Sequence, residues 1–200
     1  MDENNSTVNE AVENVSYKHD ALSEDKYYTV EEWLTWDESI RSELHDGKLI
    51  MLSQPVARHQ KVLGELFGQL WLFLKGKPCD VYVAPFGVRL FENEDTAFEP
   101  DIVVICDKSK LDRIYTGAPD LVIEILSPST ARMDKLHKFR KYQKAGVKEY
   151  WIVDAEDNYI QASVLKDGSY ITTMHGAEDI APVTVLDGCE INLADVFEDE

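Results

Sequence analysis

The sequence has few cysteines and no paired cysteine motif. Cys79, Cys106 and Cys189 lie far apart, and no C-x-x-C pair occurs. This absence excludes a zinc knuckle and a dithiol redox motif of the usual spacing. We therefore expect three reduced, mostly buried thiols, because free cysteine commonly packs as a small hydrophobic side chain.

Long apolar runs are also missing. A membrane-spanning helix needs roughly 18–20 apolar residues, and the most apolar helical stretch, 62–74, contains Glu65 and Gln69. The N-terminus, MDENNSTVNEAVENV, is polar and acidic and lacks the apolar centre of a signal peptide. We expect a cytoplasmic protein with no membrane partner.

Basic residues are scarce, because 20 lysines and arginines stand against 38 acidic residues, giving a net charge of −18. Residues 1–25 hold seven acidic residues and one lysine, and they are predicted to be a disordered acidic tail. The remainder, 26–200, is predicted to form one domain. This excess of acidic residues is unusual for a protein that binds phosphates, because such proteins normally present a basic face.

Nucleotide-binding and serine-hydrolase loops are absent, since neither a G-x-x-x-x-G-K-[ST], a G-x-G-x-x-G nor a G-x-S-x-G motif occurs. What is present is an alternation of helical and extended patterns. Helices are predicted near 30–36, from Ala57 or Arg58 to about 74, and over about 131–145 with Gly146 as the stop. Extended segments are predicted in SELH and KLIML around Asp46-Gly47, and in DVYVAP, GVRLF, DIVVIC, DLVIEIL, EYWIVD, YIQASVL and SYITTMH. The order predicts an α/β (α+β) fold with a central mixed β-sheet flanked by helices.

Two carboxylates lie on the predicted strands. Glu124 shares one face of DLVIEIL with Val122 and Leu126, and a carboxylate in such an apolar strand is costly unless it is paired or bound to a metal. Asp101 opens the strand DIVVIC, and pairing the two strands would bring both acids to one end of the sheet. Oxygen ligands of this kind suit Mg²⁺ or Mn²⁺. The alternative is that Glu124 pairs with a buried arginine or lysine.

Other polar residues admit two interpretations each. Glu43 either faces solvent on its strand, which spacing alone favours, or joins the other acids. His59, at the start of the long helix, is either a packed polar residue, which we favour, or a ligand or proton shuttle. The basic helix MDKLHKFRKYQKAG is either a solvated face or a source of one lysine that points at the acids and stabilises a charged transition state. Lys138 lies four residues from both Asp134 and Tyr142, on one side of this helix.

Taken in order, seven stretches resemble the Uma-two family of restriction-endonuclease-like proteins, in the PD-(D/E)XK nuclease superfamily. They are YYTVEEWL, SELHDGKLI, ARHQKV, VAPFGVRL, EPDIVVI, GAPDLVIEILSPST and DKLHKFRKYQKAGVKEYWIVD, and they span about 27–197. GAPDLVIEILSPST is the most specific of them.

The resemblance implies a restriction endonuclease-like fold in which Asp101 and Glu124 bind a catalytic Mg²⁺, together with the backbone carbonyl of Ile125. It also implies that Glu43 completes the acidic cluster, that DNA is the substrate and that a homodimer forms. The superfamily lysine two residues after the second acid is replaced here by Leu126. As in the family, the lysine is expected on the following helix, at Lys138 or else at Lys135.

Three functions follow from these expectations. The first is a Mg²⁺- or Mn²⁺-dependent endonuclease that hydrolyses DNA phosphodiester bonds. The second is a non-catalytic binding or regulatory module on the same fold, which the net charge of −18 favours. The third is a nuclease that needs a basic partner to deliver its substrate.

Overall fold

The computed structural model describes residues 22–23, 25–37, 39–127 and 133–198 of the chain. The predicted disordered tail therefore lies almost wholly outside the described residues. Two compact units are present, the first comprising 1–53 and 93–98 and the second 54–92 and 99–200. The predicted single domain over 26–200 stays a prediction.

The first unit is built on a short hairpin. Strands β1 (Ser42–His45) and β2 (Lys48–Met51) pair antiparallel, and β1 also pairs with β5 (Ala97–Phe98). The turn residues Asp46 and Gly47 both have positive φ, 53° and 78°, as a two-residue hairpin turn of right-handed twist requires. The hairpin predicted at this dipeptide is therefore confirmed.

A capping box starts the single-turn helix of this unit, α2 (Val30–Trp33). The Thr29 hydroxyl accepts from the Glu32 backbone N–H, and the Glu32 carboxylate accepts from the Thr29 backbone N–H. Asp95 fixes the helix near the hairpin, because its carboxylate accepts from the Val30 N–H at 3.0 Å and its carbonyl from the Gly47 N–H.

The second unit contains a six-stranded mixed sheet in the order β11-β10-β9-β8-β6-β3. The strands are β3 (Asp80–Val83), β6 (Ile102–Ile105), β8 (Leu121–Ile125), β9 (Glu149–Asp154), β10 (Tyr159–Lys166) and β11 (Ser169–Gly176). Only β8 and β9 run parallel among the neighbouring pairs of this sheet. Parallel neighbours need a crossover, which α4 (Met133–Ala145) supplies.

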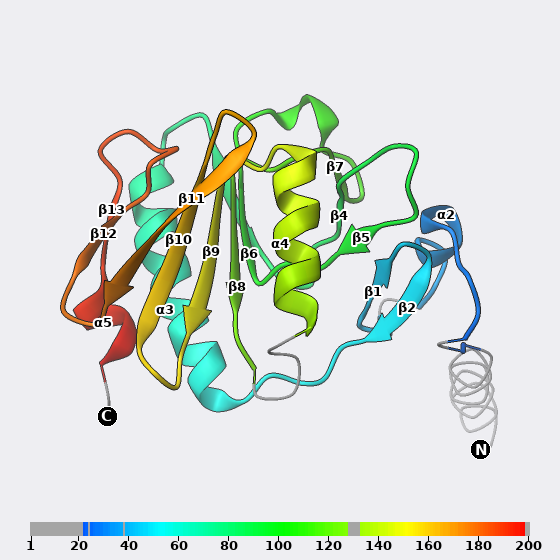
Figure 1. Cartoon of the computed structure of the whole chain (residues 1–200), viewed down its shortest axis with the longest axis horizontal. Coiled ribbons are helices and arrows are strands. Elements are labelled where there is room, and N and C mark those ends of the chain that lie inside the picture. The colour runs from blue at the N-terminus through cyan, green and yellow to red at the C-terminus, as the bar shows by residue number, and fades with distance from the viewer. Residues whose placement is uncertain (1–21, 24, 38, 128–132, 199–200) are drawn as a thin grey trace, which may run out of the picture. The chain divides into compact units, whose positions relative to one another are not determined.

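Helices α3 (Ala57–Leu74) and α4 cover opposite faces of this sheet (Figure 1). Alternation along the strands explains the arrangement. Trp151 of β9 joins the core beneath α3, whereas its neighbour Tyr150 points the other way and packs on Tyr142 of α4, with ring centroids 4.9 Å apart. The helix α4 ends where the sequence predicts, because Gly146 takes a φ of 90° and its N–H bonds back to the Tyr142 carbonyl.

Smaller elements complete the second unit. They are the parallel pair β4 (Val88–Arg89) and β7 (Tyr115–Thr116), the 3-10 turn Lys108–Lys110, the antiparallel pair β12 (Ile180–Pro182) and β13 (Glu190–Asn192), and α5 (Leu193–Phe197). Within the part of the chain that is described, no helix is both long and apolar enough to cross a membrane.

The expectation of three reduced thiols is wrong for two of them. Cys79 and Cys106 form a disulfide, and only Cys189 is a free, buried thiol. The sheet register explains the pairing. Asp80 of β3 lies opposite Ile105 of β6, so the residues just beyond this pair, Cys79 and Cys106, face each other.

Candidate active site

Asp101 and Glu124 lie at the same end of two neighbouring strands, as the strand pattern predicts. Ile102 of β6 pairs with Ile123 of β8, and each acid is the next residue outward from this pair. Leu121, Ile123 and Ile125 belong to the core beneath α3, which leaves Glu124 on the opposite face of β8.

The Asp101 carboxylate is held from two directions. Its Oδ2 accepts a hydrogen bond from the backbone N–H of Ile125 at 2.7 Å, which ties it to the residue directly after Glu124. The same oxygen lies 3.3 Å from Nε2 of His59, in the first turn of α3. The two acids are thus linked through the backbone of β8.

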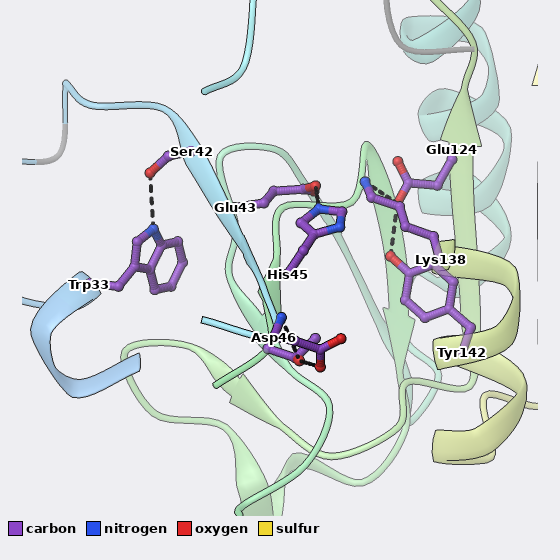
Figure 2. A network of polar contacts seen from close by, with 9 residues as sticks. Trp33, Ser42, Glu43, His45, Asp46, Glu124, Lys138 and Tyr142 are labelled. Atoms are coloured by element: carbon purple, nitrogen blue, oxygen red, sulfur yellow. Dashed lines mark hydrogen bonds and ion pairs between the residues drawn. The ribbon is translucent and has the colours of Figure 1, made fainter. Parts of the chain in front are cut away.

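Glu124 is held by two residues of α4 (Figure 2). Its Oε1 accepts from Lys138 Nζ at 3.0 Å and from the Tyr142 hydroxyl at 2.8 Å. Lys138 is 9 % exposed and Tyr142 is fully buried, so this side of α4 is not a solvated face. Of the two interpretations of the basic helix, the geometry matches the one in which a lysine points at an acid, and that lysine is Lys138. The side chain of Lys135 lies outside the described residues.

The pairing of Glu124 with Lys138 also answers the question left open by the strand pattern. A buried lysine lies at this carboxylate, as the alternative to a metal predicts. Lys138 therefore balances the charge of Glu124. The pair lies at the same end of the two strands as Asp101.

His59 is a residue whose place the sequence did not reveal. It is 6 % exposed, and its Nδ1 is buried without a hydrogen-bond partner among the described residues. Burial alone would lower the pKa of His59, but the Asp101 carboxylate, a backbone hydrogen bond with Ile125 and the charge of Glu124 together outweigh it and raise the pKa above its ordinary value. The favoured interpretation, a packed polar residue, describes its burial but omits its contact with Asp101.

Glu43 belongs to the first compact unit. It is 2 % exposed, and its Oε2 lies 2.9 Å from Nε2 of His45, two residues along the same strand (Figure 2). The interpretation of Glu43 as a solvent-facing residue is therefore wrong. Its predicted membership of the acidic cluster stays a prediction.

The carboxylates at the site are chemically suited to a divalent cation. Among the described side chains, no group of three or more histidines, cysteines, aspartates or glutamates could hold a metal ion. The predicted set needs no third side chain, since Mg²⁺ binds through one or two carboxylates and keeps several waters. Two carboxylates joined through the Ile125 backbone are hard oxygen donors that fit Mg²⁺ or Mn²⁺.

One comparison shows the fold and another shows the family. The α+β fold matches that of a crystal structure described as a putative nuclease belonging to DUF820 from Anabaena variabilis ATCC 29413. The TM-score is 0.71 at 21 % identity, over 85 % of this chain and 97 % of that one. The model of the Uma2 family, described as "Putative restriction endonuclease", matches residues 30–194, so the chain belongs to this family.

Two relatives come from Synechocystis sp. (strain ATCC 27184 / PCC 6803 / Kazusa), and both are named as uncharacterized proteins. The protein sll1609 is 28 % identical over 135 residues, which are 64 % of this chain and 76 % of the relative. The protein slr1290 is 29 % identical over 115 residues, which are 56 % of this chain and 60 % of the relative.

Proposed function

We propose that the chain is a Mg²⁺- or Mn²⁺-dependent endonuclease that hydrolyses DNA phosphodiester bonds, with its catalytic centre at Asp101 and Glu124. The observation that carries the proposal is the Lys138–Glu124–Ile125–Asp101 connection. Two acids, a buried cation and a backbone amide are joined by contacts of 2.7–3.0 Å at one end of the sheet. Membership of a family described as "Putative restriction endonuclease" supports the same chemistry.

Each residue has a distinct task in this proposal. Asp101, Glu124 and the backbone carbonyl of Ile125 would bind the cation. When bound, the cation supplies a water of lowered pKa and polarises the scissile phosphate. Lys138, an ammonium held in a largely buried position, would orient the nucleophile or neutralise the charge that develops on the phosphate.

The test is nicking of supercoiled plasmid DNA with Mg²⁺ or Mn²⁺. We expect Asp101→Asn, Glu124→Gln and Lys138→Met to abolish nicking while the unfolding transition remains cooperative. Asp120→Asn is a matched control, because Asp120 is a buried carboxylate just before β8 that bonds the Cys106 N–H and Lys148, away from the acids. Wild-type nicking by purified Asp101→Asn or Glu124→Gln would refute the assignment.

A second candidate is a non-catalytic binding or regulatory module on the same fold. The net charge of −18 favours it, because nonspecific DNA affinity comes mainly from phosphate contacts. Calorimetry with Mg²⁺ and Mn²⁺ separates the two candidates when it is combined with the plasmid assay. Metal binding without cleavage of any DNA or RNA tested supports the module and contradicts the nuclease.

The predicted homodimer stays a prediction.

A further inference from the structure

The edge strand β11 is long and lacks the features that usually prevent further pairing. It ends the six-stranded sheet, and all eight of its residues, SYITTMHG, pair one to one with β10. Proteins commonly protect such edges with charged side chains, proline, bulges or a very short strand. β11 has none of these, since it contains no lysine, arginine, aspartate, glutamate or proline.

The opposite edge of the same sheet, β3, is protected. This strand has four residues, and the first of them, Asp80, forms an ion pair with Lys108. Pro85 follows two residues after the strand ends, and it cannot extend a ladder because it has no N–H. Of the two edges of this sheet, only β11 is therefore open to another strand.

The register of the β10–β11 hairpin shows which backbone groups of β11 point outward. Leu165 of β10 lies opposite Tyr170, and the Leu165 N–H donates to the Lys148 carbonyl, away from β11. This pair therefore exchanges no hydrogen bonds within the hairpin. Bonded and non-bonded pairs alternate along an antiparallel ladder, so the N–H and C=O groups of Tyr170, Thr172 and Met174 point outward. Within the described part of the chain, these backbone groups have no partner.

We propose that β11 pairs antiparallel with β11 of a second copy of the chain, about a two-fold axis at Thr172. In this register Thr172 lies opposite Thr172 of the second copy, and Tyr170 lies opposite Met174. Each outward N–H of these three residues then meets an outward C=O of the other copy. The two six-stranded sheets join into one continuous sheet.

Charge and symmetry identify a second copy as the occupant of this edge. The chain has a net charge of −18, so two copies repel each other where their acidic surfaces meet. The contact through β11 brings no acidic or basic side chain from either copy. Ile171 and Met174, which are 55 % and 56 % exposed, both lose exposed apolar surface in it. The two-fold contact is also closed, because it uses the same edge of both copies and leaves neither free for a third.

Analytical ultracentrifugation of the full chain tests the pairing at the two-fold axis. Thr172→Glu places two carboxylates directly opposite each other, and Thr172→Lys places two ammonium groups there. Like charges in this position are destabilising, so each variant should raise the dissociation constant of the dimer about tenfold. An equimolar mixture of the two variants should dimerise as the wild type does, because opposite charges then meet. A mixture that stays monomeric, although both variants unfold cooperatively, would overturn the proposal.

Thr172→Pro tests the backbone hydrogen bonds of the same contact. It removes an N–H that points away from β10, so the ladder within the chain survives, but two bonds between the copies are lost. The dissociation constant should again rise about tenfold. Thr172→Val is the matched control, because it loses the same hydroxyl contact with Ser163 but keeps the N–H, and it should dimerise as the wild type does. Equal dimerisation of the proline and valine variants contradicts the pairing.

Amide hydrogen exchange of the wild type gives a readout that needs no variant. The N–H groups of Tyr170, Thr172 and Met174 should be protected at high protein concentration and exchange rapidly on dilution. The Thr173 N–H, which points to β10, should stay protected throughout. A wild type that is monomeric at every concentration, or protection that does not change on dilution, rules the proposal out. These measurements need no nuclease activity, so they decide the pairing whether or not the chain cleaves DNA.

Discussion

Replacing Lys138 by methionine tests how the buried pair at the site is held together. The substitution keeps an unbranched apolar side chain as far as Cε, with sulfur in place of Cδ, and removes the ammonium. The side chains of Lys138 and Glu124 are 11 % and 14 % exposed, so Glu124 would be left as a largely buried carboxylate that has lost its cation. Breaking a buried ion pair in this way costs about 3–5 kcal/mol. The Tyr142 hydroxyl still donates to Glu124, so we expect the lower end, about 3 kcal/mol.

The assay is urea unfolding followed by tryptophan fluorescence, since Trp151 is fully buried in the core beneath α3. A double variant, Lys138→Met with Glu124→Gln, should recover most of the loss, because no unpaired charge remains. The expected coupling between the two positions is about 2 kcal/mol, within the range measured for residues in contact.

Lys108→Met provides the comparison for this prediction. Lys108 pairs with the Asp80 carboxylate, and the two side chains are 45 % and 47 % exposed. Exposed pairs contribute about 0–1 kcal/mol, so this variant should unfold almost as the wild type does. The reasoning is refuted if Lys138→Met costs no more than Lys108→Met, or if the double variant is less stable than Lys138→Met alone.

Three further predictions concern groups away from the site. The Cys79–Cys106 disulfide closes a separation of 27 residues, so reduction should lower the free energy of unfolding by about 3.5 kcal/mol, measured by urea unfolding with and without dithiothreitol. Cys189 should be unreactive to thiol reagents at neutral pH in the folded protein, because burial raises its pKa to about 11; rapid labelling before unfolding would contradict this. Burial also raises the pKa of Glu149, against the hydrogen bonds from Trp151 and Val185. A raised folded-state pKa means that its contribution to stability is complete below its ordinary value of 4.5 and is lost as pH rises through the folded value. The stability advantage of the wild type over Glu149→Gln should therefore shrink as pH rises, and a gap that is constant or widens would contradict this assignment.

Local patterns were sufficient to predict most elements of the fold. The apolar spacing from 62 to 74 and the strand DLVIEIL gave α3 and β8 within a few residues, and the Asp46-Gly47 dipeptide gave the first hairpin. Each of these features depends on neighbours within one turn or one strand. The strand β4 lies within the predicted extended segment GVRLF. The two-residue strands β5 and β7 were not predicted, because so short a segment shows no alternation.

The parts of the site that the sequence did not reveal depend on long-range contacts. Lys138 and Tyr142 lie four residues apart on one helix, so their common side was visible from spacing. His59 meets Asp101 across 42 positions of sequence, and nothing near His59 marks that contact. The disulfide was missed for the same reason, since it follows from the register of β3 and β6 and not from the spacing of its cysteines.

The acidity of the chain and the chemistry of the site act on different steps of the proposed reaction. At the site the acids have partners within the chain, because Lys138 lies at Glu124 and His59 at Asp101. The surplus negative charge therefore resides elsewhere, where it weakens the approach of DNA and leaves the geometry of the acids intact. Cations that could meet phosphates are in part committed, as Lys108 is paired with Asp80. Weak binding of DNA lowers the occupancy of the site at low substrate concentration. It does not lower the rate of cleavage once DNA is bound. Nicking measured at low salt with DNA in excess thus reports the chemistry of Asp101 and Glu124, whereas its salt dependence reports the charge of the body.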